Sequence, residues 1–339
     1  MKIASFNIQK FGKKKFQDPK VQSIVFKIVS RYDIVLILEV VDESEKTAET
    51  FLKDLNKFSS ERPFSMKISK RLGRTVYKEQ FLFLYREDVV NVTAMYQYED
   101  NQAGDVDAFE REPYIMRLAS TNTVVKDWVM IPVHTKPEDS EKELDELYDV
   151  VKAVRKKWTT DNIMILGDFN ADGGYMSKKK MKSLRIFSDK NYHWLIDEDE
   201  DTTTRLKNDN TYDRIVVYGT NMLDGVVPNT AKAFNFQKEY SLTEEEALKV
   251  SDHYPVEVEL KERKSSGQSK QRNSLFYTSS LLQTTTHDSK FTLQSRLNYK
   301  IKKNNPPFLF QAQENVENKE EKKHWEWCWD DVKNIYIYK

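Results

Sequence analysis

Residues 164–172 read MILGDFNAD, and this stretch shapes our expectation of the whole fold. An apolar run of strand length ends there in the polar sequence Gly-Asp-Phe-Asn, so Asp168 and Asn170 should lie where a strand ends. In α/β sheets, ligands bind at the edge where strands end. Other polar side chains at or near predicted strand ends are those of Asn7, Glu39, His134, Asp213, Asp252 and His253. We therefore expect one site at a sheet edge, assembled from distant parts of the chain.

Short apolar runs alternate with helical stretches up to about residue 262. The segments that we expect as strands are Lys2–Ile8, Asp33–Glu39, Phe81–Tyr85, Tyr114–Ala119, Trp128–Val133, Asn162–Leu166, Arg214–Val217 and Tyr254–Leu260. Helical spacing is found in Pro19–Ser30, Ala48–Asn56, Glu141–Trp158 and Thr243–Lys249. This mixture predicts an α/β architecture in one domain, residues 1–262.

The composition limits the class of protein. The 339 residues carry 54 Lys+Arg against 54 Asp+Glu, which argues against a protein that holds nucleic acid by electrostatics alone. No uncharged apolar run reaches about 18 residues, so we expect no transmembrane helix. Cys328 is the single cysteine, so an intramolecular disulfide is impossible.

Beyond residue 262 the sequence becomes polar and basic and loses any sustained periodicity. We expect residues 263–339 to be an extension that is largely disordered. The aromatic cluster Trp325–Trp329 is the exception and suggests either a short linear contact or a local hydrophobic cluster. The alternative is a stretch with no selected function.

The polar residues at the strand ends form an oxygen-rich ligand set with two imidazoles. Such a set suits Mg²⁺ or Ca²⁺ better than Zn²⁺, and neither HExxH nor paired CxxC occurs. The motifs GxxxxGK[ST], GxGxxG and GxSxG are also absent. Singly, each residue has a plainer explanation: a strand-end charge for Glu39, a structural histidine for His134 and an Asx turn for residues 167–170. Their combination favours a metal-assisted site.

Several longer stretches point to a known family. They are SFNIQKFG (5–12), YDIVLILEV (32–40), RLGRTVYKEQFLFLYRED (71–88), FEREP (109–113), VMIPVHTKPE (129–138), MILGDFNAD (164–172), TYDRIVVYG (211–219) and LTEEEALKVSDHYPVEV (242–258). Together they resemble the deoxyribonuclease I family of the endonuclease/exonuclease/phosphatase superfamily, and its deoxyribonuclease gamma branch in particular. The resemblance implies a four-layer α/β sandwich, with two mixed sheets face to face and helices outside. It also implies an endonuclease that uses Mg²⁺ and Ca²⁺ to cleave DNA to 5′-phosphate and 3′-hydroxyl ends.

The resemblance also implies roles for the strand-end residues. Glu39, with Asn7 and Asp168 nearby, would hold a divalent ion against the scissile phosphate, and Asp252 would complete its surroundings. His253 would act as general base, oriented by Asp213. His134 would act as general acid, oriented by Glu79, although the sequence leaves open which histidine does which job. Asn170 would hydrogen-bond a phosphate oxygen.

Residues outside this centre match further family positions. Arg111 and Tyr77 match positions that contact nucleic acid. Asp201 and Thr203 match a structural Ca²⁺ loop, and Asp107 lies in the region of a second one. The plainer alternative for Asp201 is a solvated acidic loop, because it ends the run 197–201 of Asp and Glu.

The chain also departs from the family pattern. The family normally has a disulfide where Gly173 and Asn210 stand here. Basic residues are usual at the positions of Gln9 and Val41, so we expect weaker DNA affinity and a shallower salt dependence than in relatives.

Alternatives remain open at this point. An abasic-site endonuclease, sphingomyelinase or inositol phosphatase of the same superfamily would share much of the site, and a catalytically idle or marginally folded member is a third possibility. DNA is the expected partner and a monomer the expected state, with actin binding and the form of the substrate left open. By resemblance the protein is secreted, in the secretory pathway or nuclear, but no signal peptide precedes the first predicted strand, so an intracellular location stays open.

Overall fold

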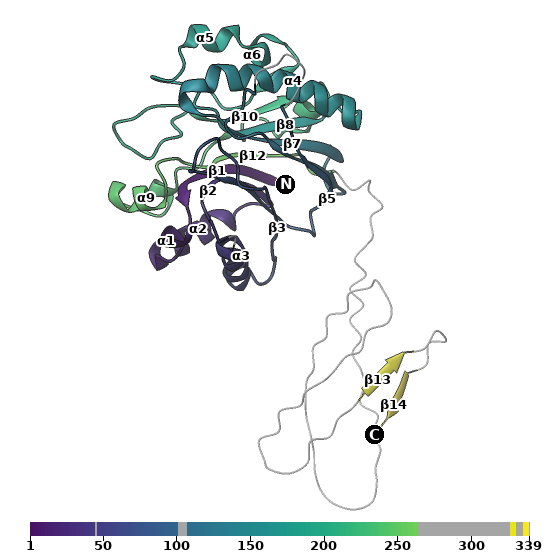
Figure 1. Cartoon of the computed structure of the whole chain (residues 1–339). Coiled ribbons are helices and arrows are strands. Elements are labelled where there is room, and N and C mark those ends of the chain that lie inside the picture. The colour runs from purple at the N-terminus through teal and green to yellow at the C-terminus, as the bar shows by residue number, and fades with distance from the viewer. Residues whose placement is uncertain (45, 101–106, 264–325, 330–334, 339) are drawn as a thin grey trace, which may run out of the picture. The chain divides into compact units, whose positions relative to one another are not determined.

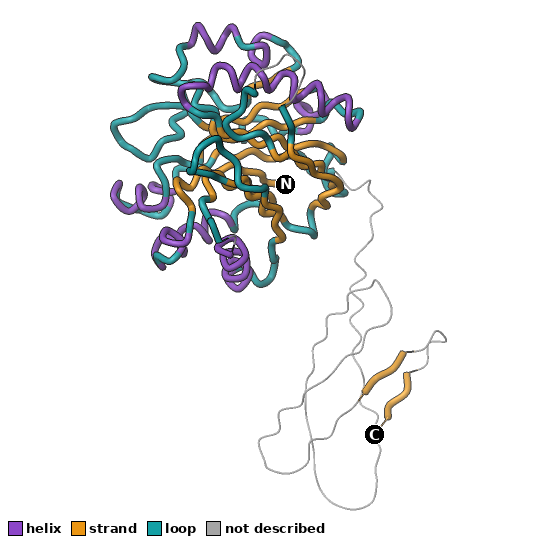
Figure 2. The backbone as a smooth tube through the Cα atoms, in the orientation of Figure 1, coloured by secondary structure: helices purple, strands orange, loops and turns teal. Residues whose placement is uncertain are grey.

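The computed structural model describes residues 1–44, 46–100, 107–263, 326–329 and 335–338. Two six-stranded sheets form the centre of the fold (Figures 1 and 2). The first has the strand order β11 (Lys232–Ala233), β12 (Val256–Glu259), β1 (Lys2–Phe11), β2 (Ile34–Val40), β4 (Gln80–Tyr85) and β3 (Ser65–Ile68). The second has the order β5 (Val90–Gln97), β6 (Tyr114–Ser120), β7 (Asp127–His134), β8 (Ile163–Asp168), β10 (Asp213–Tyr218) and β9 (Tyr192–Trp194).

Each sheet contains one parallel pair at its centre. β1 pairs in parallel with β2, and β7 pairs in parallel with β8, whereas the other neighbours are antiparallel. Parallel strands end at the same edge, so the carboxyl ends of each pair lie together. The residues that follow or end these four strands are the ones on which the expected site depends.

The two sheets face each other across a hydrophobic core. Leu36 and Leu38 of β2 and Phe83 of β4 share this core with Trp128 and Leu166 of the opposite sheet. The alternate residues of β2, Val35 and Ile37, lie in a different cluster under the outer helices. β2 is therefore buried on both faces, which explains its almost unbroken apolar sequence.

Helices cover the outer face of each sheet. On the first sheet these are α1 (Lys13–Phe16), α2 (Pro19–Val29), α3 (Lys46–Phe58), α8 (Phe236–Glu239) and α9 (Glu244–Val250). On the second sheet they are α4 (Ser140–Trp158), which follows the 3₁₀ turn Pro137–Asp139, and the short α5 (Lys178–Ser183) and α6 (Arg185–Ser188). The short α7 (Thr220–Gly225) follows β10. The predicted four-layer α/β sandwich is confirmed.

All eight predicted strands and all four predicted helices are present, with ends shifted by a few residues. The sequence analysis missed β3, β5, β9 and β11 and the short helices α1, α5, α6, α7 and α8. β3, β5, β9 and β11 are the edge strands of the two sheets. In β5, polar residues such as Asn91 and Gln97 interrupt the apolar pattern because an edge strand is less completely buried than a central one.

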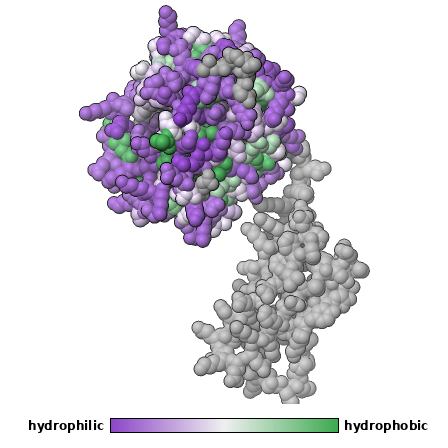
Figure 3. Space-filling model, viewed as in Figure 1, coloured by the Kyte–Doolittle hydropathy of each residue, from purple (hydrophilic) through white to green (hydrophobic). Residues whose placement is uncertain are grey.

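A second unit contains β13 (Glu326–Trp329), paired antiparallel with β14 (Ile335–Tyr338). Most of the aromatic cluster 325–329 is thus a strand. The expected disorder of residues 263–339 falls almost wholly outside the described residues, and the domain boundary at 262/263 stays a prediction. No helix in the described part of the chain is long and apolar enough to cross a membrane. The face of the molecule in Figure 3 shows mainly hydrophilic side chains, with hydrophobic ones in small separate groups.

Candidate active site

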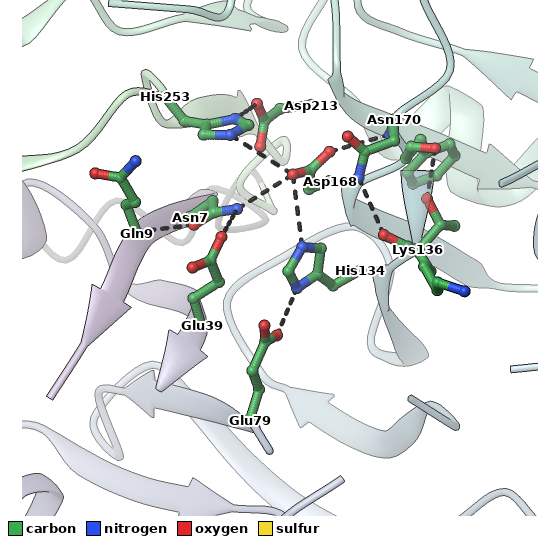
Figure 4. A network of polar contacts seen from close by, with 12 residues as sticks. Asn7, Gln9, Glu39, Glu79, His134, Lys136, Asp168, Asn170, Asp213 and His253 are labelled. Carbon is green, nitrogen blue, oxygen red and sulfur yellow. Dashed lines mark hydrogen bonds and ion pairs between the residues drawn. The ribbon is translucent and has the colours of Figure 1, made fainter. Parts of the chain in front are cut away.

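The carboxyl ends of β1, β2, β7 and β8 bring Asn7, Glu39, His134 and Asp168 together (Figure 4). The side-chain amide of Asn7 lies at the centre: its Nδ2 donates to Glu39 Oε1 at 3.0 Å and to Asp168 Oδ2 at 3.1 Å. Asn7 is fully buried. The amide therefore ties the two sheets together and holds two carboxylates at neighbouring positions.

Unusual backbone geometry aims these side chains. Gln9, Lys10 and Glu39 have φ values of 30°, 55° and 58°, a left-handed region that L-residues with side chains seldom adopt. Both β1 and β2 have a register irregularity at this point. The backbone N–H of Lys10 donates to Glu39 Oε2 at 2.8 Å, so the distortion of β1 is itself used to hold the Glu39 carboxylate. Such strain is characteristic of functional sites.

His134 is held by Glu79 and Arg111. Glu79 Oε2 lies 2.7 Å from His134 Nδ1, and Arg111 Nη1 lies 3.5 Å from Glu79 Oε1. Arg111 Nε donates to the carbonyl of His134 at 3.0 Å. Burial and Arg111 both oppose the protonation of His134, but the Glu79 and Asp168 carboxylates outweigh them and raise its pKa. Burial opposes ionisation of Glu79 as well, yet His134 and Arg111 lower its pKa to about 2.

His253 forms a second carboxylate–imidazole pair. Its Nδ1 lies 2.7 Å from Oδ2 of Asp213, a fully buried carboxylate at the start of β10. Burial opposes protonation of His253, but Asp213 and Asp168 raise its pKa well above the ordinary value. The Nε2 atoms of His134 and His253 lie 3.8 Å and 3.7 Å from the same atom, Asp168 Oδ2. The two imidazoles thus face one carboxylate from two sides (Figure 4).

The Gly-Asp-Phe-Asn turn is shaped by close approach to β7. Gly167 has φ of 145°, and a Cβ there would lie 1.9 Å from the carbonyl oxygen of Val133, so only glycine fits. After Asp168, the N–H of Asn170 donates to Asp168 Oδ1 at 3.0 Å, and Asn170 Nδ2 donates to the carbonyl of Thr135 at 3.0 Å. The turn therefore fixes the Asp168 carboxylate and joins it to the segment after His134.

Asp252 lies beside this centre. Gln9 Nε2 donates to its Oδ2 at 2.6 Å, while Oδ1 is buried and has no hydrogen-bond partner within the described residues. The possible metal ligands at the centre are therefore the carboxylate oxygens of Glu39, Asp168 and Asp252, and no sulfur ligand lies among them. Nowhere in the described ranges do three or more His, Cys, Asp or Glu gather closely enough to enclose a metal by themselves. This donor set fits a hard cation that takes its other ligands from water and substrate, as Mg²⁺ does.

The other predicted site residues border the centre. Tyr77 is 42% exposed, and burial together with the Glu79 and Glu39 carboxylates raises the pKa of its hydroxyl. Thr203 forms an antiparallel bridge with His253. Asp201 Oδ1 accepts hydrogen bonds from the N–H and the hydroxyl of Thr203, and Asp107 forms an ion pair with Arg74 at 3.0 Å. The roles of these residues in binding Ca²⁺ or DNA stay predictions.

Two residues that support the centre, the half-buried Lys15 and the buried Glu143, were missed by the sequence analysis. Lys15 Nζ donates to the carbonyls of Ile8 and Val250 at 3.1 Å and 2.9 Å, which joins the end of β1 to the segment before Asp252. Burial lowers the pKa of Lys15 to about 8, although Asp252 and Glu39 favour its charged form. Glu143 is the second residue. No sequence motif marks Lys15 or Glu143, because each forms hydrogen bonds with backbone groups of other segments, and such partners leave no trace in the sequence.

The fold and this centre define a class of hydrolase, and comparison with known proteins agrees. Residues 4–253 match the Endonuclease/Exonuclease/phosphatase family. Human deoxyribonuclease gamma is 44% identical over 261 residues, which cover 77% of this chain and 86% of that protein. Rabbit deoxyribonuclease-1 is 42% identical over 261 residues, with 77% and 92% covered. The chain therefore belongs to the deoxyribonuclease I family of endonucleases.

Solved structures show the same fold at low sequence identity. A family protein from Leptotrichia buccalis superimposes with a TM-score of 0.55 at 15% identity, covering 77% of this chain and 99% of that chain. The human Nocturnin catalytic domain gives a TM-score of 0.53 at 12% identity, covering 78% and 94%.

Proposed function

We propose that this enzyme is a divalent-cation-dependent endonuclease that hydrolyses DNA phosphodiester bonds to 5′-phosphate and 3′-hydroxyl ends. The observation that carries the proposal is the pair of carboxylate–imidazole dyads, Glu79–His134 and Asp213–His253, whose Nε2 atoms face one carboxylate at 3.8 Å and 3.7 Å. Two imidazoles directed at one point can supply both proton transfers of a hydrolysis.

In the proposed reaction, a water oxygen attacks phosphorus and the bond to the 3′-oxygen breaks. His253 takes the proton that the water loses, and Asp213 stabilises the resulting imidazolium. His134 gives its proton to the departing 3′-oxygen. The assignment of His134 as the acid and His253 as the base follows the family resemblance, because nearby carboxylates raise the pKa of both imidazoles.

We further propose that Glu39, Asn7, Asp168 and Asp252 form the cation site, with Mg²⁺ the cation that fits best. A cation there would neutralise charge on the phosphate as it builds up in the transition state. The Oδ1 atom of Asp252 supports this assignment, because it is buried without a hydrogen bond in the described part of the chain and has only the His253 imidazole at 3.8 Å. Ca²⁺ is assigned to the regions of Asp201 with Thr203 and of Asp107.

Contacts to DNA are assigned to Tyr77, Arg111 and Asn170. Asn170 is assigned to a phosphate oxygen by the family resemblance; in this structure its Nδ2 donates to the carbonyl of Thr135. Gln9 and Val41 supply no cation, and Gln9 is occupied with Asp252. We therefore expect weaker binding and a smaller salt dependence than in relatives with basic residues at these positions.

Nicking of supercoiled plasmid tests the proposal. We expect activity with Mg²⁺ and Ca²⁺, none with EDTA, and a loss on the order of 10²-fold or more in His253→Ala and in His134→Ala. Both variants should keep the far-ultraviolet circular dichroism of the wild type. Metal-dependent hydrolysis of a sphingolipid or an inositol phosphate in preference to DNA would instead identify a different phosphodiesterase of the superfamily. Full nicking activity in either variant would refute the assigned roles.

A further inference from the structure

Glu143 of α4 is a buried carboxylate that lies behind the His134 dyad and takes no part in the reaction proposed above. Its side chain is 1% exposed. Its Oε1 accepts the backbone N–H of Lys136 at 2.9 Å, and the backbone N–H of Glu110, from a second loop, favours the charged carboxylate and lowers its pKa. Among the described residues it forms no ion pair within 4 Å, so its partners are two peptide groups from two different loops.

Each of these loops carries one residue of the centre. Glu110 directly precedes Arg111, and Lys136 follows His134 by two residues. The segment after His134 is already fixed on its other side, because Asn170 Nδ2 donates to the carbonyl of Thr135. Arg111 in turn donates to the carbonyl of His134. The Glu143 carboxylate thus closes a ring of polar contacts around Arg111 and His134.

Two backbone N–H donors directed at one side chain are best served by two acceptor oxygens. An ionised carboxylate offers two, whereas a protonated carboxyl or a carboxamide offers one acceptor and turns a donor toward the second N–H. Burial raises the pKa of Glu143 to about 7, opposed by the Lys136 N–H and by Arg111. A charge at this place therefore lowers the stability of the fold, so a purely structural role would be filled better by a neutral side chain.

We propose that Glu143 is a positioning residue of the active site, which fixes the Arg111 loop against the His134 loop by accepting one amide from each. The inference rests on the proposed nuclease function and names a residue through which that function is tuned. Glu143 acts on the proton transfer from His134, without contacting the substrate itself.

The experiment compares two diester substrates in Glu143→Gln, His134→Ala and wild type. Plasmid DNA has an alkoxide leaving group that needs a proton from the general acid, whereas bis(p-nitrophenyl) phosphate has a leaving group that needs none. We expect Glu143→Gln to lower kcat/KM on DNA by on the order of 10- to 100-fold, as displacements of about 1 Å do, and on the p-nitrophenyl ester by less than about threefold. His134→Ala should show the same preference. Glu141→Gln is the matched control, because Glu141 is an exposed residue of the same helix that pairs with Lys180 at 2.7 Å.

The outcomes separate the inference from the proposed function. A wild type that does not nick plasmid overturns the proposed function, and the inference with it. A wild type that nicks, with a Glu143→Gln variant that loses the same factor on both substrates or shows no loss on DNA, overturns the inference alone. A lower melting temperature of Glu143→Gln than of wild type at pH 8 would show that Glu143 has a structural role, and it would likewise overturn the inference. If Glu143→Gln does not fold, Glu143→Asp serves in its place, because the shorter side chain keeps the charge but cannot reach both amides.

Discussion

Gly173 and Asn210 lie face to face, and this suggests that a disulfide can be built at the place where the family normally has one. A Cβ added at Gly173 would lie 2.5 Å from Asn210 Oδ1 and 3.4 Å from Asn210 Cγ. A cysteine Sγ at position 210 would stand close to the present Cγ, within reach of a cysteine at position 173. We therefore predict that Gly173→Cys with Asn210→Cys forms a bridge.

The expected gain follows from the length of the loop that is closed. The closed loop would contain about 38 residues with both cysteines included, which corresponds to about 4 kcal/mol of entropy removed from the unfolded chain. Gly173 has φ of +57°, and a side chain in that conformation costs about 1 kcal/mol. The net expectation is about 3 kcal/mol, or a rise of about 6–12 °C in Tm for a domain of this size.

Urea unfolding with and without a reductant measures the gain. Cys328, the single natural cysteine, is changed to serine in every protein so that it cannot form a wrong pair. Gly173→Cys and Asn210→Cys alone are the controls for the substitutions themselves. If mass spectrometry shows the bridge but the oxidised protein gains less than about 1 kcal/mol over its reduced form, then the loop does not behave as an unfolded-state constraint and our reasoning is wrong.

Three further predictions concern stability. The pKa of Glu79 is about 2 when folded and 4.5 ordinarily, so its ion pair stabilises the fold above pH 4.5 and weakens as pH falls toward 2. Wild type should lose about 2 kcal/mol through this group between pH 6 and pH 3, and Glu79→Gln should not; equal losses in urea titrations would contradict this. The pKa of Glu143 is raised from 4.5 to about 7, so the destabilisation that its charge causes is complete above pH 7 and absent below pH 4.5. Glu143→Gln should gain about 3 kcal/mol relative to wild type from pH 4 to pH 8, and a pH-independent difference would count against it. Thr243 and Glu246 form a capping box at the start of α9, so Thr243→Ala should cost about 1 kcal/mol of unfolding free energy, with Thr243→Ser as a near-neutral control.

The amino-acid pattern alone was enough to predict the central strands, the longer helices and the chemical types of the site residues. Strands such as β2 and β8 are buried on both faces, and only a continuous apolar run satisfies such a position. A polar residue at the end of such an apolar run contrasts with the residues before it, and this contrast is how Glu39, His134 and Asp168 were predicted as site residues. Edge strands and single-turn helices lack this signal because less of their surface must be apolar.

Which side chains contact one another became clear only from the three-dimensional fold. The partners of the two dyads are 55 and 40 residues apart in sequence, and in both dyads a side chain of one segment is held 2.7 Å from a side chain of another. Glu143 and Lys15 carry no pattern at all, because their partners are peptide groups that any sequence would offer. Gly173 and Asn210 look unrelated along the chain and lie in contact in the fold. The local sequence pattern reflects how much of each residue is buried. Contacts between distant segments depend instead on how the two sheets pack. The site lies where four strand ends meet, so it forms only when that packing is complete.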